Sequence, residues 1–403
     1  MTSRADRRGS FGLAWLLGHR GLILLLLGVL VVATGLLPWA DARPVLERAA
    51  PVLGFLVLIK LVADLCDDAD LFDLVAHGAA RLARGRTAVL YLLFCGVGIV
   101  ATWVLSLDTT AVLLTPIALA LAAELGVAPL PFAFASVWLA NAASLLLPVS
   151  NLTNLLAQHH LSLTSGQFMH LLTWPQAAVL VVVVGTLLVR HRTALRGRYP
   201  VSEHLPKHDP WLVWPAALVA TATGPAIVAG VEAWEAALGG FLVLLVAFVV
   251  RQPGTVVPRR LVRLAPWDMA AFALGLFLVI AAVMRPAHTL VAEALGAGTG
   301  AGDLLQLAGV ATVLANATNN LPTYLALEPF AAEPARAAAL LVAVNVGPVV
   351  LIWGSLANLL WRDRCRVRGL EVSSRRFALE GLLVMPTAVA AGVLAVALAV
   401  AAR

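Results

Sequence analysis

The stretch Leu107-Asp108-Thr109-Thr110-Ala111 and its second-half counterpart Thr318-Asn319-Asn320-Leu321-Pro322 interrupt long apolar runs, and they decide the expected fold. Each is followed by an asparagine, Asn141 or Asn345, and then by a second polar break. These breaks read Ser150-Asn151-Leu152-Thr153-Asn154 and Gly354-Ser355-Leu356-Ala357-Asn358. In both copies the last asparagine follows the middle one by 13 residues. Polar breaks in apolar sequence are costly, so two matched sets predict one site at the interface of two structural repeats, as in many secondary transporters.

The composition places this chain in a membrane. Its 403 residues are 61% hydrophobic and 12% charged, whereas soluble proteins are about 45–50% apolar and about 25% charged. Apolar runs of roughly 20 residues are continuous rather than alternating, which favours spanning helices over a barrel. The 28 basic residues outnumber the 22 acids, but they gather in loops, where they indicate orientation rather than a nucleic-acid partner.

The apolar runs predict an all-α polytopic membrane protein of two inverted repeats, each with a re-entrant hairpin and a broken transmembrane helix. The hairpins are expected at Thr87–Glu124, broken at Leu107–Thr110, and at Leu304–Ala332, centred on Asn319. An amphipathic surface helix is expected within Asp67–Arg86. Nine full spans are expected at Gly21–Pro38, Val45–Cys66, Pro131–Ser162, His170–Val189, Trp211–Gly230, Leu238–Val250, Met269–Met284, Arg336–Trp361 and Phe377–Ala401, the third and eighth being the broken ones. Pro116, Pro148, Pro322 and Pro348 flank the breaks and are expected to stop helices there.

This pattern divides the chain into five segments. Residues 1–86 hold N-terminal scaffold helices and the surface helix, and residues 87–190 form the first repeat. Residues 191–210 are a cytoplasmic linker, residues 211–286 add further scaffold helices, and residues 287–403 form the second, inverted repeat.

Loop charges predict the orientation of a multi-pass protein of the inner (plasma) membrane. The N-terminus, with Arg4, Arg7 and Arg8, is expected in the cytoplasm and the C-terminus outside. The basic loops around 81–86, 190–208, 251–263 and 362–376 then fall inside. The loops near 40–48, 159–169, 231–235 and 285–303, which are poor in arginine, fall outside.

Asp108 is the only acid between Arg86 and Glu124. A carboxylate at the centre of a membrane helix costs about 2.5–3.5 kcal/mol, so it is expected to have a partner or a function. One interpretation is a proton carrier, because desolvation favours the neutral form. The other is a helix cap formed by the carboxylate with help from Thr109 and Thr110.

Neutral polar side chains dominate both motifs, and no lysine or arginine lies within either hairpin core, which weighs against a strongly anionic substrate. The alternative role for these side chains is hydrogen bonding between helices. Because the two sets match and stand at backbone breaks, a substrate site is the favoured interpretation. Its expected residues are Thr109, Thr110, Asn141, Ser150, Asn151, Thr153, Asn319, Asn320, Asn345 and Ser355.

Other chemistry finds little support. Cys66, Cys95 and Cys365 are far apart, so they predict neither disulfides nor a metal site. No nucleophile–base pair is evident and no cofactor is expected, so the chain is not read as an enzyme. Lys60 and Asp64, one helical turn apart, are expected to form an internal ion pair or, alternatively, a proton relay. Glu328 follows the second hairpin tip and is expected to face an outer vestibule.

The motifs resemble those of the arsenite efflux permease family within the ion transporter superfamily. The resemblance rests on residues 107–116, 140–154, 319–329, 345–348 and 354–357, which span most of the chain. It departs at Val349-Val350-Leu351-Ile352-Trp353, where the family more often has small or polar residues, so Trp353 could reshape the site. The resemblance implies an inner-membrane carrier that exports arsenite or antimonite by proton antiport. It also implies a possible homodimer and a possible soluble ATPase partner.

Arsenite is a neutral polyhydroxyl acid at pH 7, so it suits a pocket of Asn, Ser and Thr, with Asp108 as the proton-coupling residue. Two alternatives stay open. The first is a sodium/proton or other small-ion antiporter of the same superfamily, and the second is the membrane subunit of an ATP-driven pump. This chain has no nucleotide-binding loop of its own, so any ATPase would be a separate protein.

Overall fold

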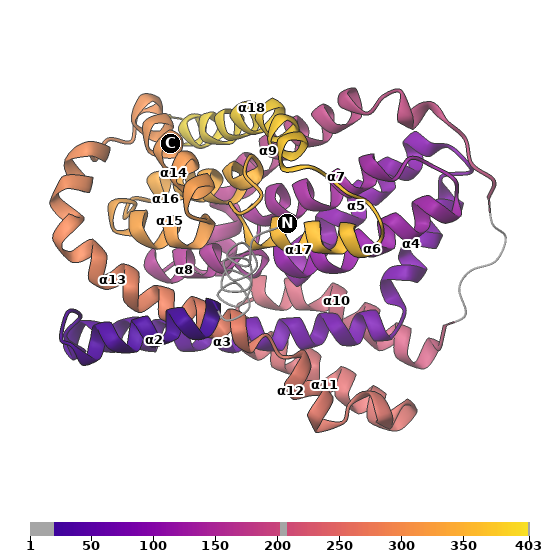
Figure 1. The fold of residues 1–403 in the computed structure, drawn as a ribbon, viewed down its shortest axis with the longest axis horizontal. Helices are drawn as coiled ribbons and strands as arrows, with labels where there is room; N and C mark the ends of the chain where they lie inside the picture. Colours follow the sequence, from indigo (N-terminus) through magenta and orange to yellow (C-terminus); the bar gives the residue numbers. More distant parts are fainter. Residues whose placement is uncertain (1–19, 202–207, 402–403) are drawn as a thin grey trace, which may run out of the picture.

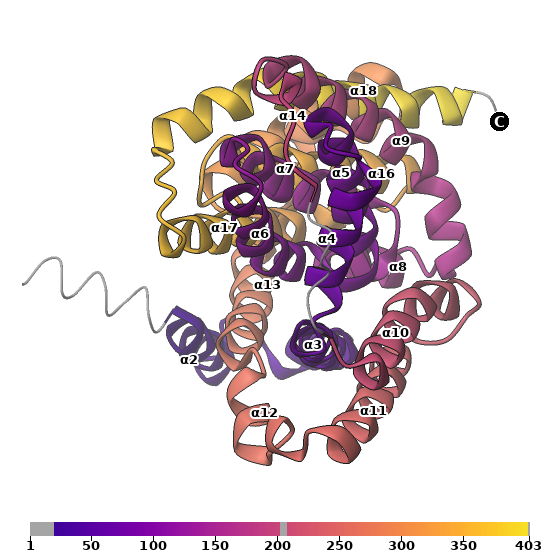
Figure 2. The same ribbon diagram turned by 90° about the vertical axis from the view of Figure 1, so that its right-hand side faces the viewer.

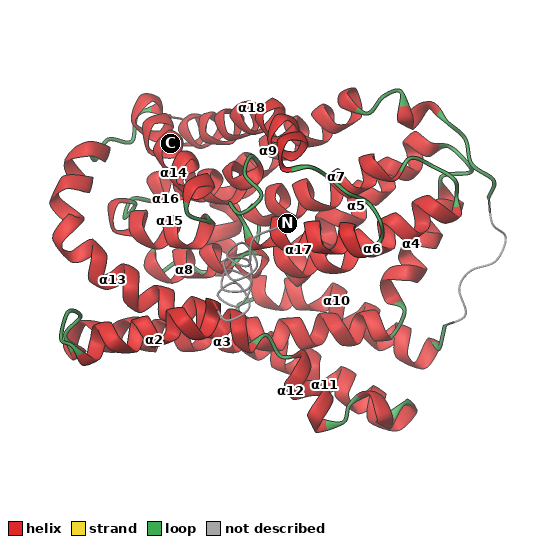
Figure 3. Ribbon diagram, viewed as in Figure 1, coloured by secondary structure: helices red, strands yellow, loops and turns green. Residues whose placement is uncertain are grey.

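The computed structural model describes residues 20–201 and 208–401, and helices make up nearly all of that part of the chain (Figure 3). Eight of the described helices are long and apolar enough to cross a membrane: α3 (Trp39–Asp68), α5 (Thr87–Leu105), α6 (Leu107–Glu124), α9 (Ser165–Arg190), α10 (Pro210–Val228), α11 (Ala233–Arg251), α13 (Trp267–Leu295) and α18 (Ser374–Ala401). Shorter helices are α2 (Arg20–Ala33), α4 (Leu71–Leu82), α7 (Pro129–Ala142), α8 (Leu152–His160), α12 (Pro258–Leu264), α14 (Ala301–Ala317), α15 (Asn320–Leu327), α16 (Pro334–Val346) and α17 (Leu356–Val367). The prediction of an all-α polytopic membrane protein is confirmed.

The helices form two layers, seen one above the other in Figures 1 and 2. One layer holds α2, α3 and α10–α13. The other holds α5–α9 and α14–α18, where the two halves of the chain interleave, since α18 packs along α9 and α17 along α6. The inverted symmetry of the two halves and the five segment boundaries stay predictions.

A buried aromatic cluster holds the second layer together. The ring centroids of Phe134 on α7 and Trp361 on α17 are 5.7 Å apart, and those of Trp361 and Phe377 on α18 are 5.4 Å apart. Trp361 Nε1 donates to the Ala133 carbonyl oxygen at 2.7 Å, so the indole N–H is satisfied inside the core. This cluster fixes helices of the second half directly on a helix of the first.

Both predicted helix breaks occur, each at a non-glycine residue with positive φ. Ser106 (φ 80°) separates α5 from α6, and Asn319 (φ 141°) follows α14 and begins α15. The first break therefore precedes Leu107–Thr110, which was expected to be broken, because the Thr110 amide already bonds to the Ser106 carbonyl at 3.0 Å. Re-entry of these two helix pairs into the bilayer stays a prediction.

The four flanking prolines divide into two kinds. Pro148 and Pro348 stand in the short 3-10 turns η2 (Pro148–Ser150) and η6 (Gly347–Val349), where the predicted broken spans are interrupted. Pro116 instead lies inside α6, and Pro322 lies in the first turn of α15. The expectation that all four stop helices was wrong for these two, since the first turn of a helix tolerates proline and α6 continues past it.

Two stretches expected to be outer loops are largely helical. The helix α3 already begins at Trp39, so residues 40–48 belong to it, and α13 continues through the predicted loop to Leu295. The charged residues in these stretches suggested loops. They are accommodated on helices because they form ion pairs. Arg43 pairs with Glu47 on α3, and Arg285 of α13 pairs with Asp41 at 3.4 Å.

Two of the basic segments begin with an arginine that pairs with a neighbouring helix. Arg190 at the end of α9 pairs with Glu380 at the start of α18 at 2.8 Å, and Arg251 pairs with Asp209 at 2.9 Å. The turn between α2 and α3 and the C-terminal end of α18 lie at the opposite end of the molecule from these two pairs (Figure 1). Which end faces the cytoplasm stays a prediction. The N-terminal arginines and residues 202–207 of the linker lie outside the described residues.

The close packing of α2 on α13 generates a stability prediction. A methyl group at Gly275 would overlap the backbone of Leu24 and Leu25 on α2. The Gly275→Ala variant should therefore push α2 off α13 and lose about 1–3 kcal/mol of stability. A lower midpoint of thermal unfolding in detergent would report it. The control is Gly54→Ala on α3, where nothing lies within 4 Å, and whose midpoint should stay or rise. Equal midpoints for both variants would contradict this account of the contact.

Candidate functional site

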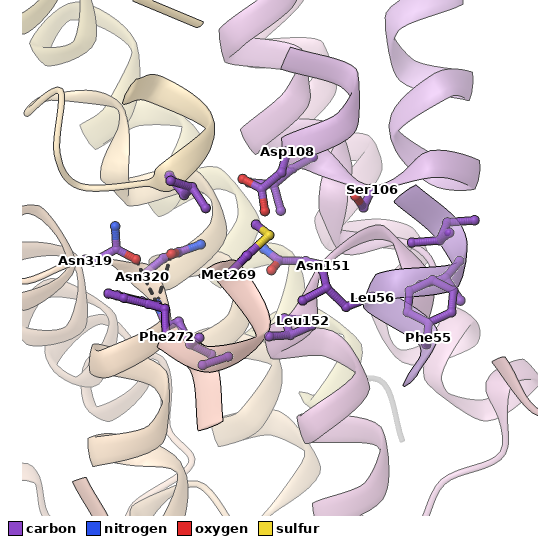
Figure 4. A pocket seen from close by; sticks show the side chains of 16 residues that line it. Phe55, Leu56, Ser106, Asp108, Asn151, Leu152, Met269, Phe272, Asn319 and Asn320 are labelled. Carbon is purple, nitrogen blue, oxygen red and sulfur yellow. Dashed lines mark hydrogen bonds between the residues drawn. The ribbon is translucent and has the colours of Figure 1, made fainter. Parts of the chain in front are cut away.

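A small chamber of about 50 Å³ lies where the two helix breaks meet α3 and α13 (Figure 4). Its polar wall comes from Ser106 and Asp108 beside the first break, Asn151 at the start of α8, and Asn319 and Asn320 at the second break. Its apolar wall comes from the other layer and consists of Phe55, Leu56, Ile59, Met269, Phe272 and Ala273. The chamber therefore lies between the two layers, with polar groups on one side only.

Four helix N-termini converge on this region. The helix α6 starts beside Asp108, and three further helices begin with a side-chain cap. Asn151 Oδ1 accepts from the Thr153 amide at 3.3 Å, Asn319 Oδ1 from the Leu321 amide at 3.4 Å, and Ser355 Oγ from the Ala357 amide at 3.2 Å. Helix N-termini carry partial positive charge. Together they favour negative charge in the chamber without any basic side chain.

Asp108 stands in the first turn of α6, one position after the helix begins, and points into the chamber (Figure 4). The capping position belongs to Ser106, whose hydroxyl donates to Thr109 Oγ1 at 3.3 Å. Asp108 is therefore not the cap residue itself. Asp108 is a partly buried carboxylate that faces a chamber at a helix N-terminus, and its proton-coupling role stays a prediction.

The asparagines at the centre of the motifs pair across the two halves. Asn345 Nδ2 donates to Asn154 Oδ1 at 2.8 Å, and Asn141 Nδ2 donates to Asn358 Oδ1 at 3.0 Å. Each middle asparagine thus bonds the last asparagine of the other half. The amides of Asn154 and Asn358 in turn donate to backbone carbonyls freed by the breaks, those of Ser144 and Pro348 at 2.6 Å each. These bonds satisfy polar backbone that the helix breaks expose at membrane depth.

The pairing is not symmetric in detail. Asn345 Oδ1 also accepts from Asn151 Nδ2 and from Thr153 Oγ1, both at 2.8 Å. In the second half the corresponding positions are Ser355 and Ala357, and Asn141 Oδ1 accepts no hydrogen bond from the described residues. The first half therefore ties its break to the partner asparagine more tightly than the second half does.

The structure brings only some of the predicted site residues to the chamber. Asp108, Asn151, Asn319 and Asn320 line it. Asn141 and Asn345 are completely buried and bond between helices, which matches the alternative role considered for them. The remaining candidates, all buried next to the breaks, are Thr109, Thr110, Ser150, Thr153 and Ser355. A role of any of these residues in binding stays a prediction.

Sequence reasoning missed the apolar wall. Met269 and Phe272 on α13, with Phe55 on α3, face the polar tips (Figure 4). Nothing distinguishes these residues from others in ordinary apolar spans, so no local signal could have found them. Trp353, expected to reshape the site, does not line the chamber; its carbonyl oxygen accepts from Asn319 Nδ2 at 3.0 Å.

Two ion pairs involve α3, a helix that contributes to the apolar wall. Lys60 and Asp64 form the predicted ion pair on α3. Glu328, at the end of α15, is buried and pairs with Arg48 of α3, with Nη1 and Oε2 2.7 Å apart.

Known proteins resemble this chain over most of its length. A protein family described as citrate transporter matches residues 13–354. The arsenical pump membrane proteins of Escherichia coli (strain K12) and Shigella flexneri are each 25% identical over 386 residues, covering 88% of both chains. The corresponding protein of Yersinia enterocolitica is 24% identical over 380 residues. These relatives confirm the resemblance drawn from the motifs.

A solved structure shares the fold. The YdaH transporter of Alcanivorax borkumensis, described as having an unusual topology, superposes with a TM-score of 0.62 at 13% identity. The match covers 95% of this chain and 98% of that one. At this identity the likeness concerns the fold alone.

The asymmetric asparagine pairing predicts unequal effects of two matched substitutions. Asn345→Ala removes the partner of Asn151, Thr153 and Asn154, whereas Asn141→Ala removes that of Asn358 and of the Val137 carbonyl. Hydrogen bonds in membrane proteins average about 0.6 kcal/mol and reach about 1.7 kcal/mol. Asn345→Ala should therefore unfold at the lower temperature in a detergent melt. Equal or reversed melting points would contradict the network described here.

Proposed function

The chain belongs to the citrate transporter family, and from this premise we propose that it exports arsenite or antimonite across the inner membrane in exchange for protons. The observation that carries the proposal is the chamber, which is small, partly polar and built around one carboxylate. The names of the arsenical pump relatives support the solute. As a transporter of this family, the protein moves its solute rather than transforming it.

The size and chemistry of the chamber suit a small neutral solute. A cavity needs about 10–15 Å³ to hold one water molecule, so about 50 Å³ accommodates roughly three or four heavy atoms. Arsenous acid has one arsenic and three oxygens. The amides of Asn151, Asn319 and Asn320 supply both donors and acceptors for its hydroxyl groups. Citrate is several times larger and carries three carboxylates, and none of the described residues that line the chamber is basic.

Asp108 provides the coupling in this mechanism. A neutral solute that moved alone could only reach equal concentrations on both sides. Exchange for an inward-moving proton adds about 2.3 kcal/mol per 100 mV of membrane potential. Asp108 would take up the proton while the chamber is accessible from outside and release it to the cytoplasm. The converging helix N-termini stabilise its ionised form after release.

A second candidate function is favoured by a specific observation. The relatives are named pump membrane proteins, which fits a membrane subunit that works with a separate ATPase. The basic segments at residues 190–208 and 362–376 would then be the docking surface. The sodium/proton alternative differs in the ion that Asp108 would bind. A homodimer, expected from the resemblance, is compatible with each of these.

The decisive measurement is arsenite uptake into everted membrane vesicles under an imposed proton gradient without ATP. Uptake that collapses with an uncoupler is the expected result. Uptake that requires ATP and a cytosolic fraction would favour the pump subunit. Uptake driven by a sodium gradient alone would exclude proton exchange, and movement of another solute would exclude the arsenical substrate.

The Asp108→Asn variant tests the coupling residue. It keeps the size and polarity of the side chain but cannot carry a proton, so gradient-driven uptake should fall at least about 10-fold, the effect of about 1.4 kcal/mol. Initial rates in everted vesicles, normalised to the amount of folded protein, measure it. The matched control is Glu124→Gln at the far end of the same helix, which should retain uptake. Full proton-driven uptake by Asp108→Asn would remove Asp108 from this role.

A further inference from the structure

A second and larger cavity, of about 520 Å³, is lined by α3, α8, α13 and α15, four helices that also line the chamber. On each of these helices, a residue that lines the chamber lies four to six positions from a residue that lines the cavity. That separation corresponds to about 6–9 Å along a helix axis. The pairs, chamber first, are Phe55 and Ala49 on α3, Leu152 and Leu156 on α8, Phe272 and Phe277 on α13, and Leu321 and Leu325 on α15.

The larger cavity lies toward the predicted outer end of the molecule. Its α3 lining extends to Pro44, near the turn that joins α2 to α3, and its α13 lining extends to Arg285, which pairs with Asp41. The chamber residues on the same helices lie deeper in the protein. The two spaces therefore follow one another along these four helices.

A buried charged cluster crosses this second space from one layer to the other. Arg48 of α3 holds Glu328 at the end of α15, and its Nη2 donates to the Leu156 carbonyl of α8 at 2.6 Å. The Tyr324 hydroxyl donates to Glu328 Oε1 at 2.7 Å. The Glu328 side chain is only 8% exposed. Arg48 of α3 thus connects its own layer to α8, which begins within the break at Ser150–Asn154, and to the end of α15, which follows the break at Asn319.

We propose that the 520 Å³ cavity is the outer compartment of the transport pathway and that the Arg48–Glu328 pair is its latch. While the pair is intact, α8 and α15 stay against α3 and the chamber is closed to the outside. When it opens, a small hydroxylated solute passes from the chamber along Tyr324 and Glu328, whose oxygen atoms replace its hydrogen bonds to the asparagines. The solute class rests on the proposed function, whereas the pathway and latch rest on the geometry and on the predicted orientation of the helices.

The geometry of the pair argues for a latch rather than a permanent brace. A buried ion pair stabilises weakly when intact, but removing one partner leaves an uncompensated charge in a poorly solvated place. The Arg48 side chain is 30% exposed, so it can be rehydrated from the cavity when it leaves Glu328. A contact that borders a cavity of this size can open without first displacing packed side chains.

Cysteine accessibility tests the proposal in the full chain. The native cysteines are buried and set the background of labelling. Two reporters are introduced singly, Ala281→Cys in the outer cavity and Ala273→Cys at the chamber. The probe is a charged, membrane-impermeant methanethiosulfonate, applied to right-side-out and to everted vesicles. Ala281→Cys should react from the outer face, and Ala273→Cys should react at least about 10-fold more slowly.

The latch is tested by adding Glu328→Gln to the Ala273→Cys reporter, which should raise the outer labelling rate several-fold. The exchange of charges in Arg48→Glu with Glu328→Arg should restore slow labelling, which a variant that merely misfolds could not do. The control Arg43→Gln, in an exposed pair on the same helix, should leave the rate unchanged.

Three results would overturn the proposal. These are labelling of Ala281→Cys from the cytoplasmic face only, its reaction only with a membrane-permeant maleimide, or an Ala273→Cys rate that ignores Glu328→Gln. The labelling needs no arsenite. The proposed solute can therefore be disproved while the pathway is confirmed, and the pathway can be disproved while the solute is confirmed.

Discussion

The pairing of asparagine amides across the two halves is the constraint on which the rest of the structure depends. A helix that is interrupted inside a membrane exposes carbonyl groups that water cannot reach, and each unsatisfied group is costly. Asn154 and Asn358 solve this problem by donating to the carbonyls of their own break, and their side-chain oxygens accept from Asn345 and Asn141 of the other half. The two asparagines that satisfy the breaks are therefore themselves held by hydrogen bonds from the other half.

Because some asparagines are engaged in satisfying the breaks, only a few polar side chains line the chamber. The central asparagines Asn141 and Asn345 bond between helices, so the polar wall of the chamber presents Asn151, Asn319 and Asn320 opposite a wall that is mainly hydrocarbon. The charge that faces the chamber comes from Asp108 and from the partial charges of four helix N-termini. Under the proposed function, such a chamber would select by size and would disfavour a large anion, since none of the described lining residues is basic. The proposed solute, arsenite or antimonite, therefore differs from citrate, the solute in the family's description.

The sequence predicts the helices and both breaks well because apolar runs and backbone breakers are local signals. Prediction from the sequence fails where the role of a residue depends on a contact between distant segments. Arg48 lies within the predicted span Val45–Cys66, but nothing in the sequence shows that it pairs with Glu328, 280 positions away. The matched asparagines indicate a shared interface, but only the fold separates Asn319, which lines the chamber, from Asn345, which bonds between helices. The apolar wall at Met269 carries no local signal at all.

The cross-half pairing also sets the order of events when the chain is made. Asn154 leaves the ribosome 204 residues before Asn358, and its partner Asn345 is nearly as late. At about 5–20 residues per second, the first half waits roughly 10–40 s in the membrane without the amides that complete it. The hydrogen bonds that join the two halves therefore form only after most of the second half has been synthesised.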